Sequence, residues 1–328
     1  MEASAQWPLK VDVGLLQRFE DALDVRRPEK SAIPARVLGF GEISTVLAIE
    51  AEGLRGFAFK RMPLFAHADE VSRYTSAYQE YCRLLEQEIG LCLPSHSYAV
   101  VTGRTGRPVF YIIQRQLPAE CIGNRLLHRV GKEGVSILVR RVLEELHKVW
   151  LFNGRQAEVQ VAIDGQISNW AVAPEGNGQP PLSEAGLWYL DTSTPLFRVA
   201  GVEQLDTELF LRSAPSFLVW ILRLFFLQDV VNRYYDFRRV VLDLAANFYK
   251  EQCAGFIPVV LETANRFFAQ EAAALDLAPI SDREVAAYYR EDAFIWRLYL
   301  CMRKMDRFLR SRLLRGHYPY LLPDKIKR

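Results

Sequence analysis

The sequence predicts an α+β protein built in two lobes, and three observations support this. Residues 36–114 contain short apolar runs separated by turn residues, as β-strands do. One segment within them, residues 69–89, has apolar residues at helical spacing. After Gln114 helical spacing dominates. We therefore expect a five-stranded antiparallel sheet with one helix in the first lobe, and a mainly helical second lobe.

The first lobe is expected to span residues 1–116, with residues 1–34 as a helical extension that contains a helix at 14–23. Residues 52–53 and 103–107 have the glycine content of hairpin turns. They separate the second strand from the third and the fourth from the fifth. The five predicted strands are residues 36–40, 44–50, 56–60, 98–102 and 109–114.

The second lobe is expected to span residues 117–328. Its predicted helices are residues 135–152, 217–249, 258–274 and 282–315, the last with a break near 290–291. Short strands are expected at residues 158–163, 170–173 and 187–190, with a loop at 174–186 rich in glycine and proline. Residues 192–198 are expected to lead quickly into helix. The lobe is thus helical with a small β island.

Composition narrows the function classes. The net charge of +2, from 41 basic and 39 acidic residues, gives no global field that would select nucleic acid. The longest apolar stretch, residues 217–227, is far shorter than the roughly 20 residues of a membrane span. The scattered cysteines and the absence of a signal-peptide pattern favour a cytoplasmic protein.

A basic run at residues 303–315 continues in Lys325, Lys327 and Arg328. Apolar residues alternate with it at helical spacing, so a solvated helix face is one interpretation. Binding of an anionic substrate, a phosphate or a partner is the other.

The first strand runs into Gly39, Gly41 and Ser44, in the pattern G-x-G-x-x-S-x-V. Glycines without a Cβ let backbone amides approach phosphate oxygens. A purely structural turn between two strands would have the same glycines. The pattern alone does not separate the two.

The third predicted strand ends in Lys60, within the sequence Phe-Ala-Phe-Lys. A helix follows directly, and a glutamate on it could hold the lysine ammonium. Glu80 is our first choice, with Glu70 and Glu86 as alternatives.

Asp164 and Asn169 follow the strand at 158–163 with the spacing D-x-x-x-x-N. Asp191 follows the short apolar strand at 187–190 and is itself followed by Thr-Ser. An aspartate can accept a proton from an attacking hydroxyl, and aspartate and asparagine oxygens are ligands that Mg²⁺ accepts. Each carboxylate taken singly also fits a turn or a helix cap.

The order of these elements, over residues 36–195, resembles the protein-kinase-like superfamily. It is most similar to the small-molecule kinases related to aminoglycoside phosphotransferases and choline kinases. The resemblance implies ATP and Mg²⁺ as cofactors and a small-molecule hydroxyl as acceptor. Gly39, Gly41 and Ser44 would then form the loop over the phosphates.

The resemblance also implies roles for single residues. Lys60 would bind the α- and β-phosphates, and Glu80 would position Lys60. Asp164 would be the catalytic base. Asn169 and Asp191 would hold Mg²⁺. Residues 114–117, with Gln114 and Gln116, would form the hinge whose backbone meets adenine.

Several positions depart from the family pattern. Ala162 replaces the usual histidine, Asp-Thr-Ser replaces D-F-G, and residues 214–216 only partly match A-P-E. These departures favour a second hypothesis, a pseudokinase that binds nucleotide or a partner protein without turnover. A third is a different transferase or a helical interaction protein. Residues proposed to face the substrate, without ranking, are Arg198, Asp229, Tyr234, Tyr235 and Arg238.

Overall fold

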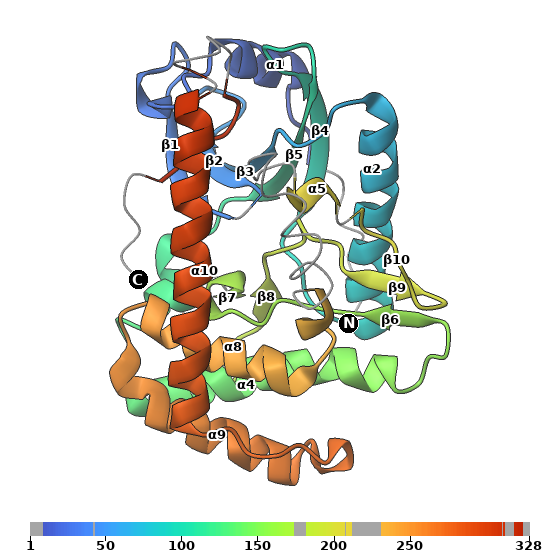
Figure 1. Cartoon of the computed structure of the whole chain (residues 1–328), viewed down its shortest axis with the longest axis vertical. Coiled ribbons are helices and arrows are strands. Elements are labelled where there is room, and N and C mark those ends of the chain that lie inside the picture. Colours follow the sequence, from blue (N-terminus) through green and yellow to red (C-terminus); the bar gives the residue numbers. More distant parts are fainter. Residues whose placement is uncertain are drawn as a thin grey trace.

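The computed structural model describes residues 9–41, 43–173, 182–206, 208–211, 231–309, 311 and 318–323. A sheet lobe lies at one end of the molecule and a helical lobe at the other (Figure 1). The predicted α+β class, with a five-stranded antiparallel sheet and a mainly helical second lobe, is confirmed.

The sheet has the order β1-β2-β3-β5-β4, and every neighbouring pair is antiparallel. All five predicted strands are present, within two residues of their predicted ends. A helix, α2 (Ala68–Arg83), connects β3 to β4 and continues as a π-helical turn at Leu84–Ile89. The strands are β1 (Ala35–Phe40), β2 (Thr45–Ile49), β3 (Phe57–Met62), β4 (His96–Thr102) and β5 (Pro108–Arg115).

Side-chain alternation gives the sheet two buried faces. On β5, Phe110 and Ile112 pack toward α2 and the helical lobe, in the larger core. Tyr111 and Ile113 point to the opposite face and pack with α1 (Val13–Ala22), in a second core. The sheet is therefore covered on both sides, which explains why β2 and most of β5 carry apolar side chains on both faces.

The helical lobe is built on α4, which packs against α9, and on α8, which packs against α10. The predicted β island is confirmed: β7 pairs with β8, and β6 pairs with β9. The helices are α3 (Gly123–Leu126), α4 (Lys132–Asn153), α5 (Glu208–Leu211), α8 (Phe237–Lys250), α9 (Ile257–Gln270) and α10 (Asp282–Phe308). The strands are β6 (Val159–Val161), β7 (Trp170–Val172), β8 (Leu187–Tyr189), β9 (Phe197–Val199) and β10 (Val202–Glu203).

Short 3₁₀ turns complete the described elements. They lie at Pro28–Lys30, Ala119–Cys121, Ile167–Asn169, Ala254–Phe256 and Ala273–Leu275. None of the helices within the described ranges is both long and apolar enough to cross a bilayer.

Three predictions about the second lobe were wrong. Helix 217–249, whose residues up to 230 lie outside the described residues, is broken before α8, because the Asp236 side chain accepts a hydrogen bond from the Arg239 amide (3.0 Å) and starts a new helix. α10 runs through residues 290–291 without a break. Residues 192–198 lead into β9, which β6 holds by backbone pairing, and not into helix.

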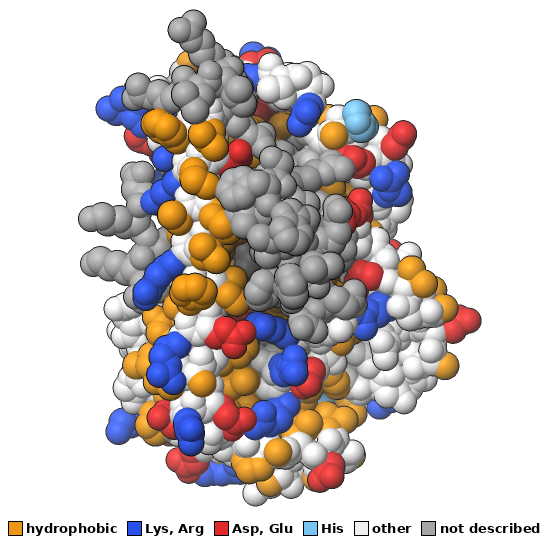
Figure 2. Space-filling view, in the orientation of Figure 1, with side chains coloured by type: hydrophobic (Ala, Val, Ile, Leu, Met, Phe, Trp, Pro, Cys, Tyr) orange, Lys and Arg blue, Asp and Glu red, His pale blue; other side chains and the backbone are white. Residues whose placement is uncertain are grey.

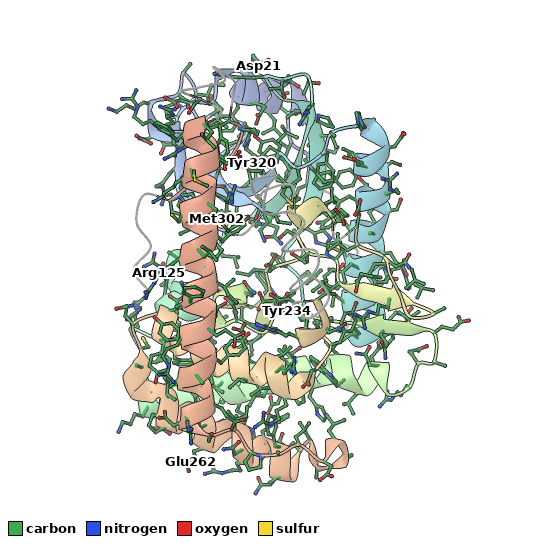
Figure 3. All side chains as sticks on the ribbon, in the orientation of Figure 1. Asp21, Arg125, Tyr234, Glu262, Met302 and Tyr320 are labelled. Carbon is green, nitrogen blue, oxygen red and sulfur yellow. The ribbon has the colours of Figure 1, made fainter. Side chains whose placement is uncertain are left out.

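The long helix α10 runs along both lobes (Figure 1). Its outer side carries exposed apolar side chains, among them Phe294, Leu298 and Phe308 (Figure 2). Beyond it, residues 318–323 lie against the sheet lobe, where Leu321 joins the core under α1. The Arg303 guanidinium lies over the Tyr320 ring at 4.8 Å, beside α10 (Figure 3). The chain end thus ties α10 to the first lobe.

A buried ion pair holds residues 318–323 against the first lobe. Arg61 on β3 donates to both carboxylate oxygens of Glu20 on α1, at 2.8 and 2.6 Å. Arg61 also donates to the Pro319 carbonyl (2.7 Å), and the Tyr111 hydroxyl donates to Glu20. The side chains of Arg61 and Glu20 are 2% and 3% exposed. Removal of one partner would leave a buried charge without compensation.

Arg61→Met is therefore expected to lower the free energy of unfolding by about 3–5 kcal/mol. The double variant Arg61→Met/Glu20→Leu should recover much of that loss, since it leaves no lone charge. Chemical denaturation of the two variants measures both values. A single variant within about 1 kcal/mol of the wild type would contradict this account of the tie.

Candidate active site

The glycine-containing turn joins β1 to β2. The Gly41 amide donates to the Ser44 carbonyl (2.9 Å) and closes the turn. A Cβ on Gly41 would lie 2.8 Å from the Ser44 hydroxyl oxygen, which would have to rotate away. A Cβ on Gly39 would meet nothing within 4 Å. Packing therefore does not explain Gly39, and open space lies beside its backbone.

Lys60 reaches across the lobes to the end of β8. Its ammonium donates to Asp191 Oδ1 at 2.7 Å and to the Ser193 hydroxyl at 3.2 Å. The Ser193 hydroxyl in turn donates to the same Asp191 oxygen (2.7 Å). The two predicted site residues, Lys60 and Asp191, are thus in direct contact although 131 positions separate them. Ser193 is a third member that the sequence reasoning missed.

Glu80 is not brought to Lys60. Its carboxylate accepts two hydrogen bonds from Arg83, at 2.9 and 2.8 Å, on the surface of α2. The inward side of α2 carries Tyr74, Tyr78 and Tyr81, all buried, so at helical spacing Glu80 lies on the outer side. The Tyr74 hydroxyl donates to the Ser193 carbonyl at 2.8 Å. A tyrosine, and not a glutamate, links α2 to the site.

The alternatives to Glu80 have other environments. Glu70 accepts a hydrogen bond from the Ala66 amide (2.8 Å), where α2 begins. Glu86 lies in the π-helical turn after α2, and burial raises the pKa of its carboxyl. Lys60, for its part, bonds to Asp191 and Ser193.

Asp164 and Asn169 stand at the two ends of one short loop. The Gln166 amide donates to Asp164 Oδ1 (2.9 Å), and the Leu190 amide donates to the Asn169 carbonyl (2.8 Å). The second bond holds the loop against the strand end that precedes Asp191. The Asn169 side-chain amide points its nitrogen toward the Asp164 carbonyl at 3.5 Å.

Three carboxyl groups give the site its electrostatics. Burial raises the pKa of Asp164 to about 8, and the nearby charges of Asp243 and Asp191 add to the effect. Burial alone would also raise the pKa of Asp191, but the Lys60 ammonium and the bonds from Lys60 and Ser193 outweigh it and lower that pKa. Burial raises the pKa of Asp243 on α8. The pKa of Asp164 is therefore raised, whereas the pKa of Asp191, which has Lys60 beside it, is lowered.

The loop is supported by residues that the sequence reasoning did not select. Ala162, where the family pattern has histidine, is fully buried, and its carbonyl accepts a bond from the Tyr81 hydroxyl (2.8 Å). Asn247 on α8 accepts from the Ile167 amide (3.1 Å). A sequence signal did exist for α8: Asp243 and Asn247 are polar residues four apart within an otherwise buried apolar face.

Gly165, an unusual neighbour for Asp164, is explained by packing. A Cβ there would lie 2.6 Å from Val240 Cγ1 and 3.1 Å from Leu146 Cδ1. Gly165→Ala should therefore force α8 or the loop to shift and lower stability by about 1–3 kcal/mol. Gly255→Ala is the matched control, since a Cβ there meets nothing within 4 Å. Equal melting temperatures for the two variants would contradict this packing.

The predicted hinge lies at the end of β5. The Gln114 side-chain amide donates to the Leu190 carbonyl (3.2 Å), close to Asp191. The Gln116 backbone amide donates to the Gly56 carbonyl (2.8 Å). Gln116 therefore has its backbone amide engaged within the first lobe.

The residues proposed to face a substrate divide into groups. Arg198 lies 3.9 Å above the Tyr235 ring, and Arg198 and the Tyr235 hydroxyl both bond to Glu203. Arg238 instead pairs with Glu284 (2.7 Å), where α10 begins. Tyr234 lies in the turn before α8, near that helix in Figure 3, and packs against the larger core. Asp229 and residues 214–216 lie outside the described residues.

A cation would find only part of a ligand set here. The described ranges contain no group of three His, Cys, Asp or Glu side chains that could hold a metal. Asn169 Oδ1 and Asp191 Oδ2 accept no hydrogen bond from the described residues. Two protein oxygens plus oxygens from a phosphate and water are what Mg²⁺ commonly takes. The residues fit a cation that arrives with a phosphate ligand.

Comparison with known proteins gives the family. The model of DUF6206 matches residues 28–307. The chain belongs to DUF6206, a family of unknown function. This DUF6206 chain has a strand lysine, a helix, strand β5 and a D-x-x-x-x-N loop in the order in which its sequence resembles protein-kinase-like proteins. No curated protein is a detectable sequence relative of it.

Two solved structures illustrate the likeness of the DUF6206 chain. "WaaP in complex with acyl carrier protein" is 16% identical with a TM-score of 0.30, over 67% of this chain and 87% of that one. The GDP complex of wild-type aminoglycoside 2'-phosphotransferase-IIIa is 12% identical with a TM-score of 0.32, over 73% and 95%. The fold assignment of the DUF6206 chain rests on its element order and not on these superpositions.

Proposed function

We propose that this protein is an ATP- and Mg²⁺-dependent phosphotransferase that acts on a hydroxyl of a small molecule. The contact of Lys60 with Asp191, beside Asn169 and Asp164, carries the proposal. Four side chains of three chemical kinds, from β3, the loop at residues 164–169 and the end of β8, lie near one another. A structural ion pair would need only Lys60 and Asp191, and would need no loop with Asp164 and Asn169.

Each group has a role in this scheme. Lys60 would exchange Asp191 for the α- and β-phosphates, and Asp191 Oδ2 and Asn169 Oδ1 would hold the metal. Bound Mg²⁺ would supply neutralisation of the phosphate charge. Asp164 would accept the proton of the attacking hydroxyl. Ser193 would keep Asp191 Oδ1 in place when Lys60 leaves it. The open side of Gly39 would admit phosphate close to the backbone.

A pseudokinase is the second candidate, and one observation favours it. Glu80 pairs with Arg83, so Lys60 has no acidic partner on α2 of the kind that active kinases use. Such a protein would bind nucleotide or a partner protein without turnover.

Thermal unfolding with ATP, with and without Mg²⁺, tests both candidates. Either one predicts a rise in melting temperature that requires both ligands. Transfer of the labelled γ-phosphate to a panel of hydroxylated small molecules then separates them. Absence of Mg²⁺-dependent ATP binding would remove both. Binding without transfer to any acceptor would favour the pseudokinase.

A further inference from the structure

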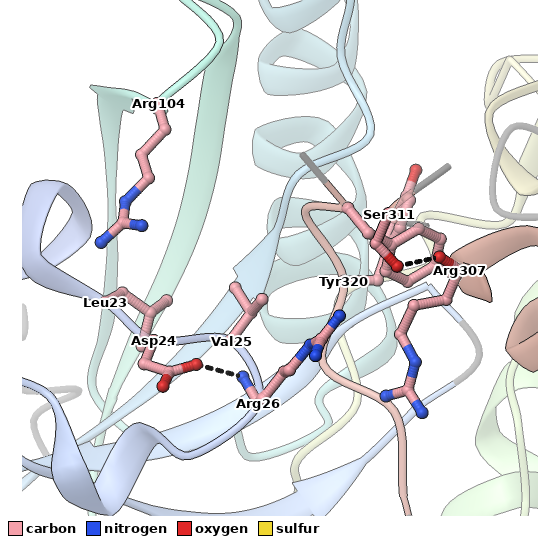
Figure 4. Close-up of a pocket in the computed structure, with 9 residues that line it drawn as sticks. Leu23, Asp24, Val25, Arg26, Arg104, Arg307, Ser311 and Tyr320 are labelled. Carbon is pink, nitrogen blue, oxygen red and sulfur yellow. Dashed lines mark hydrogen bonds between the residues drawn. The ribbon is translucent and has the colours of Figure 1, made fainter. Parts of the chain in front are cut away.

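A cavity lies where the end of α10 meets the first lobe (Figure 4), and its lining includes none of Lys60, Asp164, Asn169 and Asp191. It consists of two adjoining parts of about 450 and 610 Å³, which share Val25, Arg26, Arg307 and Ser311. We call the two parts together the arginine groove. The volume of each part lies within the range of small-molecule sites.

Basic side chains from three separate segments line the arginine groove. Arg26 comes from the loop after α1, Arg104 from the turn between β4 and β5, and Lys304 and Arg307 from α10. Arg26 and Arg307 extend into it from different walls (Figure 4). Within the described residues, no carboxylate forms an ion pair with Arg26, Arg104 or Arg307.

The two acids of the arginine groove compensate this charge only in part. Asp24 Oδ1 accepts hydrogen bonds from the amides of Arg26 (2.8 Å) and Arg27 (3.3 Å), so much of its capacity is already used. Glu29 lines only the larger part. Guanidinium groups that share a cavity repel each other, and a bound anion would remove that cost. The planar donors of arginine match phosphate oxygens in particular.

We propose that the arginine groove binds a phosphate group of a small ligand, with Arg26 and Arg307 as its main contacts. This site is independent of the proposed phosphotransfer site. Lys304 and Arg307 belong to the basic run that the sequence singled out, for which phosphate binding was one of two interpretations. Phe40, beside Gly39 and Gly41, forms part of the wall. A bound phosphate would join the loop after α1 to the end of α10 next to the glycine turn.

Calorimetric titration with pyrophosphate tests the proposal. The titration uses Lys60→Ala protein, in which phosphate binding at the candidate active site is weakened. In this background, Arg26→Gln and Arg307→Gln should each weaken binding by about tenfold or more. Arg297→Gln, an exposed arginine of α10 outside the groove, is the control and should bind as tightly as the background.

Two results would overturn the proposal: no pyrophosphate binding in the Lys60→Ala protein, or equal affinities for Arg26→Gln, Arg307→Gln and Arg297→Gln. Melting curves without ligand check that the variants fold. If Arg307→Gln does not fold, the affinity of Arg26→Gln, a change in an exposed loop, decides the test. Phosphatidylcholine vesicles with and without phosphatidic acid identify the source. Vesicle binding that needs phosphatidic acid and Arg26 assigns a lipid phosphate, and binding of pyrophosphate alone assigns a soluble one.

Discussion

Asp164→Asn is expected to stop phosphoryl transfer and, at the same time, to make the protein more stable at pH 8. Transfer should fall by about 10²–10⁴-fold, because the variant has no base to accept the hydroxyl proton. ATP binding should persist, since Asp164 contacts neither phosphate nor metal in the proposed scheme. The combined result separates a catalytic role from a structural one.

The gain in stability follows from the pKa. Burial, Asp243 and Asp191 raise the pKa of Asp164 from an ordinary 3.8 to about 8 in the folded protein. The folded state therefore holds this proton more tightly than the unfolded state, and the resulting stability is present at low pH and lost as the pH rises through 8. Asparagine carries no such charge. The expected gain is about 1–3 kcal/mol at pH 8 and little at pH 4.

Melting temperatures at the two pH values, with ATP affinity and turnover, measure these effects. Glu52→Gln, in an exposed turn, is the control for loss of a carboxylate. An Asp164→Asn protein that is less stable than the wild type at pH 8 would show that the loop needs this carboxylate to fold.

Lys60→Ala is expected to weaken ATP binding by about 10–100-fold, the cost of losing a charged contact to phosphate. Glu80→Ala, in contrast, should change it less than about twofold. The reason is that Glu80 bonds to Arg83 on the surface of α2, with 43% of its side chain exposed. Isothermal titration of the two variants gives both values. An equal loss in the two variants would mean that Glu80 moves to Lys60 when nucleotide binds.

The sequence predicted the first lobe well because its signals are local. The apolar run of β5 and the turn at residues 103–107 depend on near neighbours, and both appear in the structure. The spacing of Asp164 and Asn169 could also be read, since one short loop contains both. Asn169 lies near Asp191 because the Leu190 amide, at the end of β8, donates to the Asn169 carbonyl.

Other features depend on contacts distant in sequence. Lys60 pairs with Asp191 and not with Glu80 because Glu80 lies on the outer side of α2. Three buried tyrosines occupy the side of α2 that faces the site. The return of residues 318–323 to the sheet lobe rests on Arg61, Glu20 and the Pro319 carbonyl, which no local pattern connects. Asp236 is a local signal for the start of a helix. The sequence analysis did not use it, because the apolar residues on both sides favoured one continuous helix.

The magnesium dependence of ATP binding, measured in the wild type and in Asp191→Ala, tests the central claim most directly. In the wild type, Mg²⁺ should tighten ATP binding by about tenfold or more, through Asp191 and Asn169. In Asp191→Ala, Mg²⁺ should leave the affinity nearly unchanged. A wild type that binds ATP equally with and without Mg²⁺, or a variant that keeps the full dependence, would contradict the assignment of this site.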